Sequence, residues 1–341
     1  MESKKTEHVS SIAFESILNA SSVIKNDAIQ TDVVSSAELN KMLGHEIYFK
    51  LENLQKTGSF KFRGALYSIL KLKNNPPKHI VTYGTGNHAV ALAWAASEFL
   101  GIKVKAYLPT FTSEIKKNLI KQYGAEIIFT DTRLEAEAGA KSEAKRDDTI
   151  LLAPSDNDDV IAGAGTVSLE ALKQLEGKEI DAIFFPIGGC SLASGTVIAT
   201  KTLSPKTQMY GAEPKNANDA SMSYKTNKIC QLETSPETIA DGAKTMHISE
   251  RVFPYLKKLD GVYEITEREI EYWTVWYNHL MKDKCEPTSA LALAGAFRWL
   301  KTKKQPQKIL VIITGSHMNE SVDKEISSKH YLDVTPTNFD Y

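Results

Sequence analysis

Short apolar segments rich in β-branched residues alternate with helix-like stretches along this chain, and this alternation constrains its fold more than any other feature. Strands that are apolar throughout and separated by helices indicate parallel sheets covered on both faces, so we predict an α/β fold. In such sheets ligands bind beyond the carboxyl ends of the strands, where the candidate functional residues are therefore sought. The expected strands span 45–52, 79–84, 103–109, 125–131, 181–188, 208–213 and 308–315, and the expected helices 59–73, 87–100, 113–124 and 166–177.

Bulk composition excludes several classes of protein. The net charge of −1 gives no electrostatic basis for binding nucleic acid or an anionic membrane surface. The first ten residues lack a hydrophobic signal core, and no stretch approaches the length of a membrane-spanning helix. The three cysteines, Cys190, Cys230 and Cys285, are too far apart for a CxxC knuckle and odd in number. We therefore expect a cytoplasmic protein.

Lys61 follows the first expected strand and lies between Phe60 and Phe62 at the start of a helix. An amine held among aromatic rings is desolvated, which lowers its pKa and makes it a nucleophile able to form a Schiff base. By itself, a lysine at such a position is more often solvated. The assignment of Lys61 as a nucleophile therefore depends on the other segments described below.

Two glycine-containing turns follow later strands. The turn Gly84-Thr85-Gly86-Asn87-His88 opens an alanine-rich helix, and its backbone N–H groups suit an anion such as a substrate carboxylate. An ordinary capped turn explains it about as well, and for His88 packing is a better explanation than catalysis. The second turn suits a phosphate but matches neither the P-loop nor the GxGxxG pattern; it comprises Gly188, Gly189, Cys190, Ser191 and Leu192.

Three further positions follow strands or open helices. Thr314 places a hydroxyl at the end of the last strand, where it can face a ring nitrogen. Glu213 and Asp219 are two carboxylates in a turn that can hold a hard cation with a backbone carbonyl between them, although taken alone they are better explained as solvated loop charges. Glu286 precedes another apolar helix and is uninformative alone.

Taken together and in this order, these segments resemble the serine/threonine dehydratase and serine racemase family of fold-type II pyridoxal 5′-phosphate (PLP) enzymes. The resemblance implies a tryptophan synthase β-like fold with two open, twisted, mostly parallel sheets flanked by helices. It covers nearly the whole chain and is carried by Ser59-Phe-Lys-Phe-Arg-Gly-Ala65, Gly86-Asn-His-Ala89, Asp159-Val-Ile-Ala-Gly163, Gly188-Gly189, Ala212-Glu-Pro214, Pro236-Glu-Thr-Ile-Ala-Asp-Gly242 and Glu286-Pro-Thr288.

The resemblance also implies roles for individual residues. Lys61 would form the Schiff base with PLP, Phe60 would pack on the ring and Asn87 would bind its 3′-oxygen. Thr314 would face the pyridine nitrogen and Glu286 would lie near the ring. The remaining implied sites are the phosphate loop (Gly188, Gly189, Cys190, Ser191, Leu192), the substrate loop (Gly84, Thr85, Gly86, Asn87, His88) and a Mg²⁺, Mn²⁺ or Ca²⁺ site (Glu213, the Ala217 carbonyl, Asp219).

The chain departs from the family pattern at the site itself. Cys190 and Ser191 replace the last two of four glycines in the phosphate loop. Thr85 replaces a serine that acts as a base in the racemases, which puts racemisation in doubt. His317 stands in the loop after Thr314, where an asparagine is usual. We therefore expect a substrate preference that differs from that for plain serine or threonine.

These features predict a lyase: a PLP-dependent ammonia-lyase (dehydratase) that converts a small hydroxy-amino acid of the L-threonine or L-serine type to a 2-oxo acid and ammonia. A hydroxyl partner such as Thr314 makes PLP a poorer electron sink than a carboxylate would, which favours elimination, with Lys61 as general base and Thr85 as a second candidate catalytic residue. The alternatives are a serine racemase, a 3-hydroxyaspartate ammonia-lyase, a threonine-synthase-like or β-replacement enzyme, and a non-catalytic protein of the same fold.

We expect two domains. Residues 1–70 and 156–341 would form the large PLP-binding domain, and residues 71–155 a small inserted domain that moves to close over substrate. The family resemblance implies a homodimer.

Overall fold

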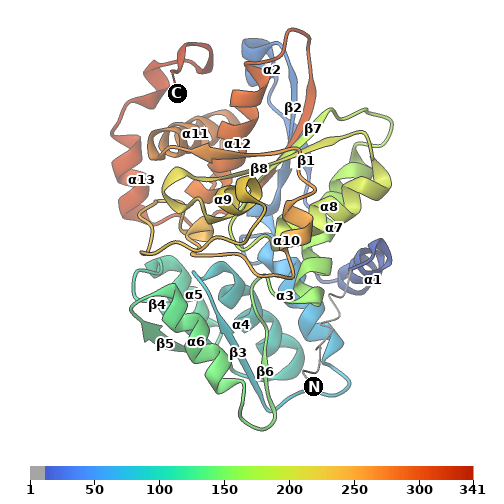
Figure 1. Cartoon of the computed structure of the whole chain (residues 1–341), viewed down its shortest axis with the longest axis vertical. Coiled ribbons are helices and arrows are strands. Elements are labelled where there is room, and N and C mark those ends of the chain that lie inside the picture. The colour runs from blue at the N-terminus through green and yellow to red at the C-terminus, as the bar shows by residue number, and fades with distance from the viewer. Residues whose placement is uncertain (1–11, 341) are drawn as a thin grey trace, which may run out of the picture.

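The structure is a computed structural model that describes residues 12–340, so the N-terminal segment assessed for a signal core lies outside the described residues. Two sheets organise this part of the chain, with strand orders β1-β2-β10-β7-β8-β9 and β5-β4-β3-β6 (Figure 1). All neighbouring strands run parallel except β1 and β2, so the predicted fold class is confirmed. The strands are β1 (Val33–Ser35), β2 (Glu46–Leu51), β3 (His79–Tyr83), β4 (Val104–Pro109), β5 (Glu126–Thr130), β6 (Thr149–Leu151), β7 (Ala182–Pro186), β8 (Gln208–Pro214), β9 (Gly261–Ile265) and β10 (Lys308–Ile313).

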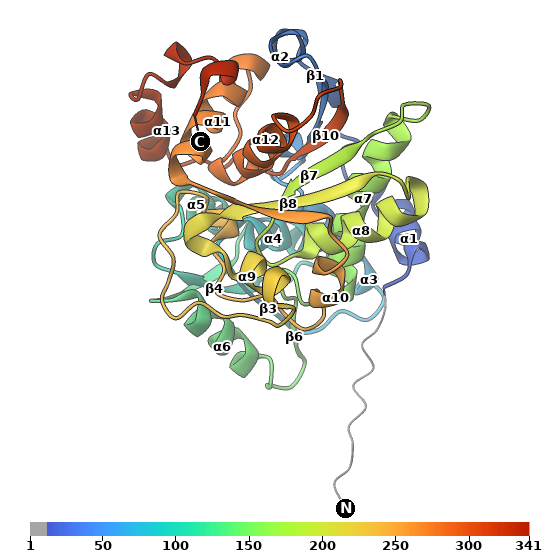
Figure 2. The same cartoon turned by 45° about the horizontal axis from the view of Figure 1, so that its top comes forward.

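Helices cover both faces of each sheet. Figure 2 shows the six-stranded sheet in the upper half of the molecule, with α11 and α12 above it, and the four-stranded sheet in the lower half, with α6 below it. The helices are α1 (Phe14–Ile24), α2 (Ala37–Leu43), α3 (Lys61–Lys71), α4 (Asn87–Leu100), α5 (Glu114–Gln122), α6 (Arg133–Glu143), α7 (Asp158–Gln174), α8 (Ser191–Leu203), α9 (Asp219–Thr226), α10 (Phe253–Leu256), α11 (Glu267–Met281), α12 (Pro287–Leu300) and α13 (Glu320–Ser327), with short 3-10 turns at Glu52–Leu54, Lys215–Ala217, Asp241–Ala243, Tyr331–Asp333 and Pro336–Asn338.

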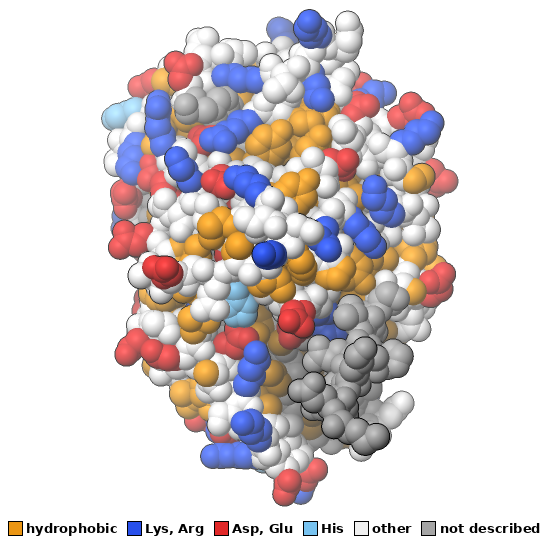
Figure 3. Space-filling view, in the orientation of Figure 1, with side chains coloured by type: hydrophobic (Ala, Val, Ile, Leu, Met, Phe, Trp, Pro, Cys, Tyr) orange, Lys and Arg blue, Asp and Glu red, His pale blue; other side chains and the backbone are white. Residues whose placement is uncertain are grey.

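The surface carries charges of both signs. On the face shown in Figure 3, lysine and arginine side chains are interspersed with aspartate and glutamate, as the near-zero net charge predicts. Within residues 12–340, every helix is too short or too polar to cross a membrane.

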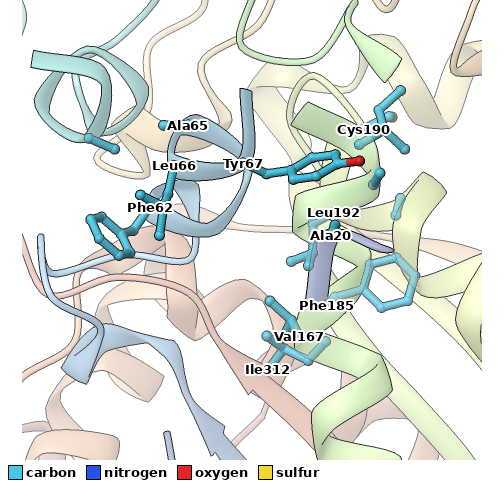
Figure 4. Close-up of a cluster of buried hydrophobic side chains, with 14 of the residues drawn as sticks. Ala20, Phe62, Ala65, Leu66, Tyr67, Val167, Phe185, Cys190, Leu192 and Ile312 are labelled. Atoms are coloured by element: carbon cyan, nitrogen blue, oxygen red, sulfur yellow. The ribbon is translucent and has the colours of Figure 1, made fainter. Parts of the chain in front are cut away.

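The central strands are apolar at consecutive positions because each face of the sheet has its own core. In β10, Leu310 and Ile312 join a cluster with α1, α3, α7 and α8, part of which is drawn in Figure 4. The alternate residues Ile309, Val311 and Ile313 pack on the opposite face with α11 and α12. Successive side chains of a strand point to opposite faces, so both sets must be apolar.

Paired glycines bring the helices on one face close together. A Cβ at Gly163 of α7 would lie 2.5 Å from the Cα of Gly64 in α3, and one at Gly195 of α8 would lie 2.4 Å from the backbone nitrogen of Gly165 in α7. No other residue fits such contacts between backbones. Gly64 and Gly163 both belong to the motifs that carry the family resemblance. Some residues of these motifs are therefore required for helix packing.

Differences from the expected elements have local causes. All seven expected strands are present, but the short strands β1, β6 and β9 had no clear apolar run in the sequence. Helix α7 begins at Asp158 rather than at 166, because the Asn157 side chain accepts a hydrogen bond from the Val160 N–H and caps the helix. Glycines at 163 and 165 mask this early start, since glycine weakens a helical pattern.

Candidate active site

The carboxyl ends of strands from both sheets meet at one cavity. All the residues predicted to bind cofactor or substrate line it: Phe60, Lys61, Gly84, Thr85, Gly86, Asn87, His88, Gly188, Gly189, Cys190, Ser191, Leu192, Glu286 and Thr314. Six further lining residues were not predicted: Arg133, Pro154, Ser155, Pro186, Gly242 and Thr288. The predicted roles of the first group remain predictions, but the fold brings these residues together.

A buried ion-pair cluster fixes the start of α3, which carries Lys61. The Arg63 guanidinium donates to both carboxylate oxygens of Glu52, at 2.8 and 2.7 Å, and also to Glu170 of α7. The side chains of Arg63 and Glu52 are almost completely buried. Bidentate pairs of this kind define geometry closely, so they hold α3 against the end of β2 and place Lys61 at the cavity.

The Lys61 amine is buried among neutral groups. It donates to the Pro154 carbonyl at 2.6 Å and to the Ser191 hydroxyl at 2.8 Å, and it lies 5.0 Å from the centre of the Phe60 ring. Burial, assisted by the positive charge of Arg133, lowers the pKa of Lys61 to about 7. This amine is therefore substantially neutral near neutral pH and available as a nucleophile.

The low pKa of Lys61 predicts an unusual pH dependence for cofactor uptake. The neutral amine is the reactive form, so the rate at which apoenzyme recovers bound PLP is expected to rise through pH 7 and level off above about pH 8. Stopped-flow absorbance measures this rate. A rate that keeps rising towards pH 10, as for an ordinary lysine, would contradict the shifted pKa.

The turn between β3 and α4 presents a helix N-terminus to the cavity. Gly84 and Gly86 have φ values of 142° and 123°, in which glycine is strongly favoured, and α4 begins at Asn87. The Nε2 of His88 lies 3.1 Å from the Leu152 carbonyl, which requires Nε2 to carry the proton. Burial lowers the pKa of His88 to about 3, so its ring is neutral. The turn can thus receive a carboxylate at the positive end of the helix.

Asn87 is oriented by neighbours on both sides. Its Nδ2 donates to the Oε1 and Oε2 of Glu286, at 2.9 and 3.1 Å, and its Oδ1 lies 3.0 Å from the Nδ1 of His317. Burial lowers the pKa of His317 to about 4, so the neutral ring donates from Nδ1. His317 is not among the residues that line the cavity, and its ring supports Asn87 from the side opposite Glu286.

The phosphate-loop candidate ends in a strained residue. Cys190 precedes α8 with a φ of 64°, a conformation that favours glycine, and glycine is the usual residue of the family pattern at this position. Its buried thiol has a pKa raised well above the ordinary value by burial, so it is a neutral group. The backbone N–H groups at the start of the thirteen-residue helix α8 remain suited to a phosphate.

Thr314 is held by Ser289 of α12. The Ser289 hydroxyl lies 3.2 Å from the Thr314 hydroxyl and accepts hydrogen bonds from the N–H groups of Thr314 and Gly315, both at 3.0 Å. A neutral hydroxyl therefore stands at the end of β10, as the sequence predicts.

Three charged residues near the cavity were missed in the sequence. Arg133 lines the cavity, and its Nη2 lies 4.0 Å from a Cβ built at Gly189 of the phosphate loop. Lys116, which is buried, forms ion pairs with Asp241 and Glu286. The only sequence signal was the position of Asp241 within the motif Pro236–Gly242. Lys116 and Arg133 lie on helices rich in solvated charges and carry no local signal.

Glu213 and Asp219 have the features of a cation site. Both are completely buried, and Glu213 Oε2 and Asp219 Oδ2 accept no hydrogen bond within the described residues. Burial raises the pKa of Asp219 to about 6, and burial together with the Asp219 charge raises the pKa of Glu213. Buried carboxylate oxygens without partners fit a hard cation, with Ala217 also buried between them in the chain. No cluster of three or more side-chain ligands occurs among residues 12–340, so backbone or water oxygens would complete the shell.

The fold has two helix-covered sheets that meet at one cavity. The cavity holds a buried lysine, a helix N-terminus, an amide and a hydroxyl. This combination is that of a fold-type II PLP enzyme. The donors fit the cofactor: Lys61 for its aldehyde, the start of α8 for its phosphate, Asn87 for its ring oxygen and Thr314 for its ring nitrogen.

Comparison with known proteins agrees with this class. The model of the family "Pyridoxal-phosphate dependent enzyme" matches residues 24–315, and the chain belongs to this family, within its serine/threonine dehydratase and serine racemase group. It is 38% identical over 321 residues to a serine racemase of Dictyostelium discoideum, covering 92% of this chain and 98% of that protein. It is 35% identical over 309 residues to the L-threo-3-hydroxyaspartate ammonia-lyase of Saccharomyces cerevisiae, covering 89% and 92%. The crystal structure of a threonine deaminase from T.th. superposes with a TM-score of 0.84 at 34% identity, covering 90% of this chain and 99% of that one.

Proposed function

We propose that this chain is an ammonia-lyase that removes water and ammonia from a small hydroxy-amino acid and releases a 2-oxo acid. The observation that carries the proposal is the Lys61 amine, buried at the cavity with its pKa lowered to about 7. A base with a pKa near the working pH is the most effective at removing a carbon-bound proton. The relatives catalyse both elimination and racemisation, so the choice depends on this chain's own residues.

In the proposed reaction the bound cofactor supplies the electron sink for the Cα carbanion. The N-terminus of α4, at Gly86 and Asn87, binds the substrate carboxylate. Lys61 takes the Cα proton on its Nζ, and the Cβ–O bond then breaks. The hydroxyl group leaves as water with the proton that Lys61 has taken, which the Ser191 hydroxyl, hydrogen-bonded to Lys61, can relay. The released enamine then reacts with water to give the 2-oxo acid and ammonia. Thr314 offers the ring nitrogen a hydroxyl rather than a carboxylate, which favours elimination over longer-lived carbanion chemistry.

Arg133 supports 3-hydroxyaspartate as the substrate in preference to threonine. Arg133 lines the cavity, and within residues 12–340 it has no ion-pair partner. An unpaired cation suits a substrate that carries a second carboxylate, whereas the methyl group of threonine gains nothing from it. A relative of this chain is named as an L-threo-3-hydroxyaspartate ammonia-lyase.

Replacement of Arg133 tests this substrate preference. In R133Q, kcat/KM for 3-hydroxyaspartate is expected to fall about 10- to 150-fold through loss of a charge-assisted hydrogen bond, while that for serine changes less than about threefold. The matched control is R146Q, which alters an exposed arginine paired with Glu143 beyond the other end of the same helix. Equal losses for both substrates would show that Arg133 does not select for the second carboxylate.

The reaction itself is tested by measuring 2-oxo acid release from L- and D-serine, L- and D-threonine and the 3-hydroxyaspartate isomers, with PLP and Mg²⁺ supplied. Pyruvate, 2-oxobutyrate or oxaloacetate identifies the lyase and its substrate. Chiral chromatography of the remaining amino acid detects racemisation. Racemisation needs a second acid–base residue besides Lys61, and Thr85 at the cavity would be that residue. Inversion of serine without 2-oxo acid would replace the proposal with a racemase.

The proposed assembly has three further parts. Glu213, the Ala217 carbonyl and Asp219 hold a divalent cation, supported by the two unpartnered oxygens. Residues 71–155 form the mobile domain, supported by the separate four-stranded sheet. The family resemblance supports a homodimer. The three free cysteines support a cytoplasmic location.

A further inference from the structure

Lys116 of α5 forms ion pairs between the region of the four-stranded sheet and the region of the six-stranded sheet. Its Nζ donates to both oxygens of Asp241 at 2.8 Å and lies 3.3 Å from Glu286 Oε2. The Lys116 side chain has no exposed surface. Asp241 and Glu286 belong to the part of the chain that follows β8, whereas α5 packs beside the four-stranded sheet. A buried ammonium is tolerated only with such partners, so this contact depends on the two regions being in place.

The stem of the same lysine packs against the substrate loop. A Cβ at Gly86 would lie 2.7 Å from Lys116 Cδ and 2.9 Å from Lys116 Cβ, so only glycine leaves room for this side chain. Gly86 immediately precedes Asn87, whose amide donates to Glu286. Lys116 thus contacts the turn that carries Asn87 and also the carboxylate that orients Asn87.

Charge explains what the ammonium does at this point. Glu286 is buried and Asp241 is partly buried, and both carboxylates face the Lys116 ammonium, whose charge offsets their mutual repulsion. Although burial alone would lower the pKa of Lys116, the charges of Asp241 and Glu286 raise it, so the residue stays protonated. Without the ammonium, the repulsion between the two carboxylates is no longer offset, so Glu286 is no longer held in place as the acceptor for the Asn87 amide.

We propose that Lys116 is a positioning residue that keeps Glu286 as the acceptor for Asn87 and ties the substrate loop to the large sheet region. The proposal rests on the cofactor-binding role assigned to Asn87 in the proposed function. Lys116 is not among the residues that line the cavity. Its effect reaches the cofactor ring through Glu286 and Asn87.

The test measures PLP binding by apoenzyme without substrate, so its outcome does not depend on which amino acid the enzyme uses. The variants are K116M, which keeps the length of the side chain without its charge, D241N, and K116M/D241N. Lys117→Met on the same helix is the control, because Lys117 pairs with Glu114 and the Thr110 carbonyl and not with Asp241 or Glu286. Absorbance titration gives the dissociation constant, the spectrum of bound PLP reports the ring environment, and thermal unfolding reports folding.

In K116M, PLP affinity is expected to fall about tenfold or more with an altered spectrum, and K117M is expected to match the unmodified enzyme. Adding D241N removes one of the repelling charges, so the double variant is expected to return to within about threefold of D241N alone. Unaltered binding and spectrum in K116M would overturn the proposal. A double variant no better than K116M would also overturn it, because Lys116 would then act by packing. If K116M does not fold, the double variant decides: recovery of folded, PLP-binding protein supports the proposal, and a second failure overturns it.

Discussion

Replacing Lys61 with alanine is expected to abolish elimination and to remove the absorbance of bound cofactor near ~410 nm together. The structure gives the cavity one amine positioned both to bind the cofactor and to take the Cα proton, at the start of α3. Loss of a nucleophile and a general base at once predicts a fall in kcat of about 10⁴-fold or more. Spectra and 2-oxo acid release measured on the same preparation check both effects.

Lys71→Ala is the matched control for this experiment. Lys71 ends the same helix, is half exposed and pairs with Asp159 at 2.7 Å, away from the cavity. It should retain full activity and the cofactor spectrum, because an exposed ion pair contributes at most about 1 kcal/mol to stability. Turnover that persists in the Lys61 variant would refute the assignment of this lysine. Loss of turnover with the spectrum retained would separate the base from the cofactor-binding group.

Chelation is expected to lower the thermal midpoint by about 5 °C and to reduce activity if Glu213 and Asp219 hold a cation. Two buried carboxylates with unpartnered oxygens repel each other, and a divalent ion removes that cost. A cation present at about a hundredfold excess over its dissociation constant contributes about 2.7 kcal/mol. Differential scanning fluorimetry with EDTA, followed by titration with Mg²⁺, Mn²⁺ and Ca²⁺, measures the shift and identifies the preferred ion.

Asp219→Asn should make the protein insensitive to both chelator and added cation. The matched control, Asp159→Asn, changes a partly exposed aspartate that pairs with Lys71 and should keep the full response. If the unmodified protein shows no response to EDTA or to any of the three ions, Glu213 and Asp219 are a buried carboxylate pair without metal. Their raised pKa values would then mean that they share a proton instead.

The site residues that follow strands could be predicted because the strands themselves can be recognised in the sequence. Lys61, Asn87, Ser191 and Thr314 each lie in the turn that follows an apolar strand, and parallel strands bring all such turns to one edge. The sequence also marked Cys190 as a departure from the family pattern. The structure adds its consequence, a left-handed backbone at a residue with a side chain, which normally costs about 1 kcal/mol or more.

His317 shows where interpretation of single residues in the sequence goes wrong. Its place after β10, where the chain departs from the family pattern, contributed to the expectation of an altered substrate preference. In the structure the His317 ring contacts the Asn87 side-chain oxygen. The position of His317 in the chain does not indicate that its side chain points towards Asn87. The same limitation hid Arg133, whose helix also contains ordinary surface charges such as Lys141, which pairs with Glu137.

The amino-acid sequence by itself determined the α/β class, seven of the strands, the turns that line the cavity and the family to which the chain belongs, because each depends on periodicity or on motifs within a few residues. Only the tertiary structure decided which charges meet. Lys116 is separated from Asp241 by 125 residues, and Arg133 lies far along the chain from Lys61, whose pKa it helps to lower. Electrostatic interaction depends on distance and burial in space, and these are properties of the folded chain as a whole.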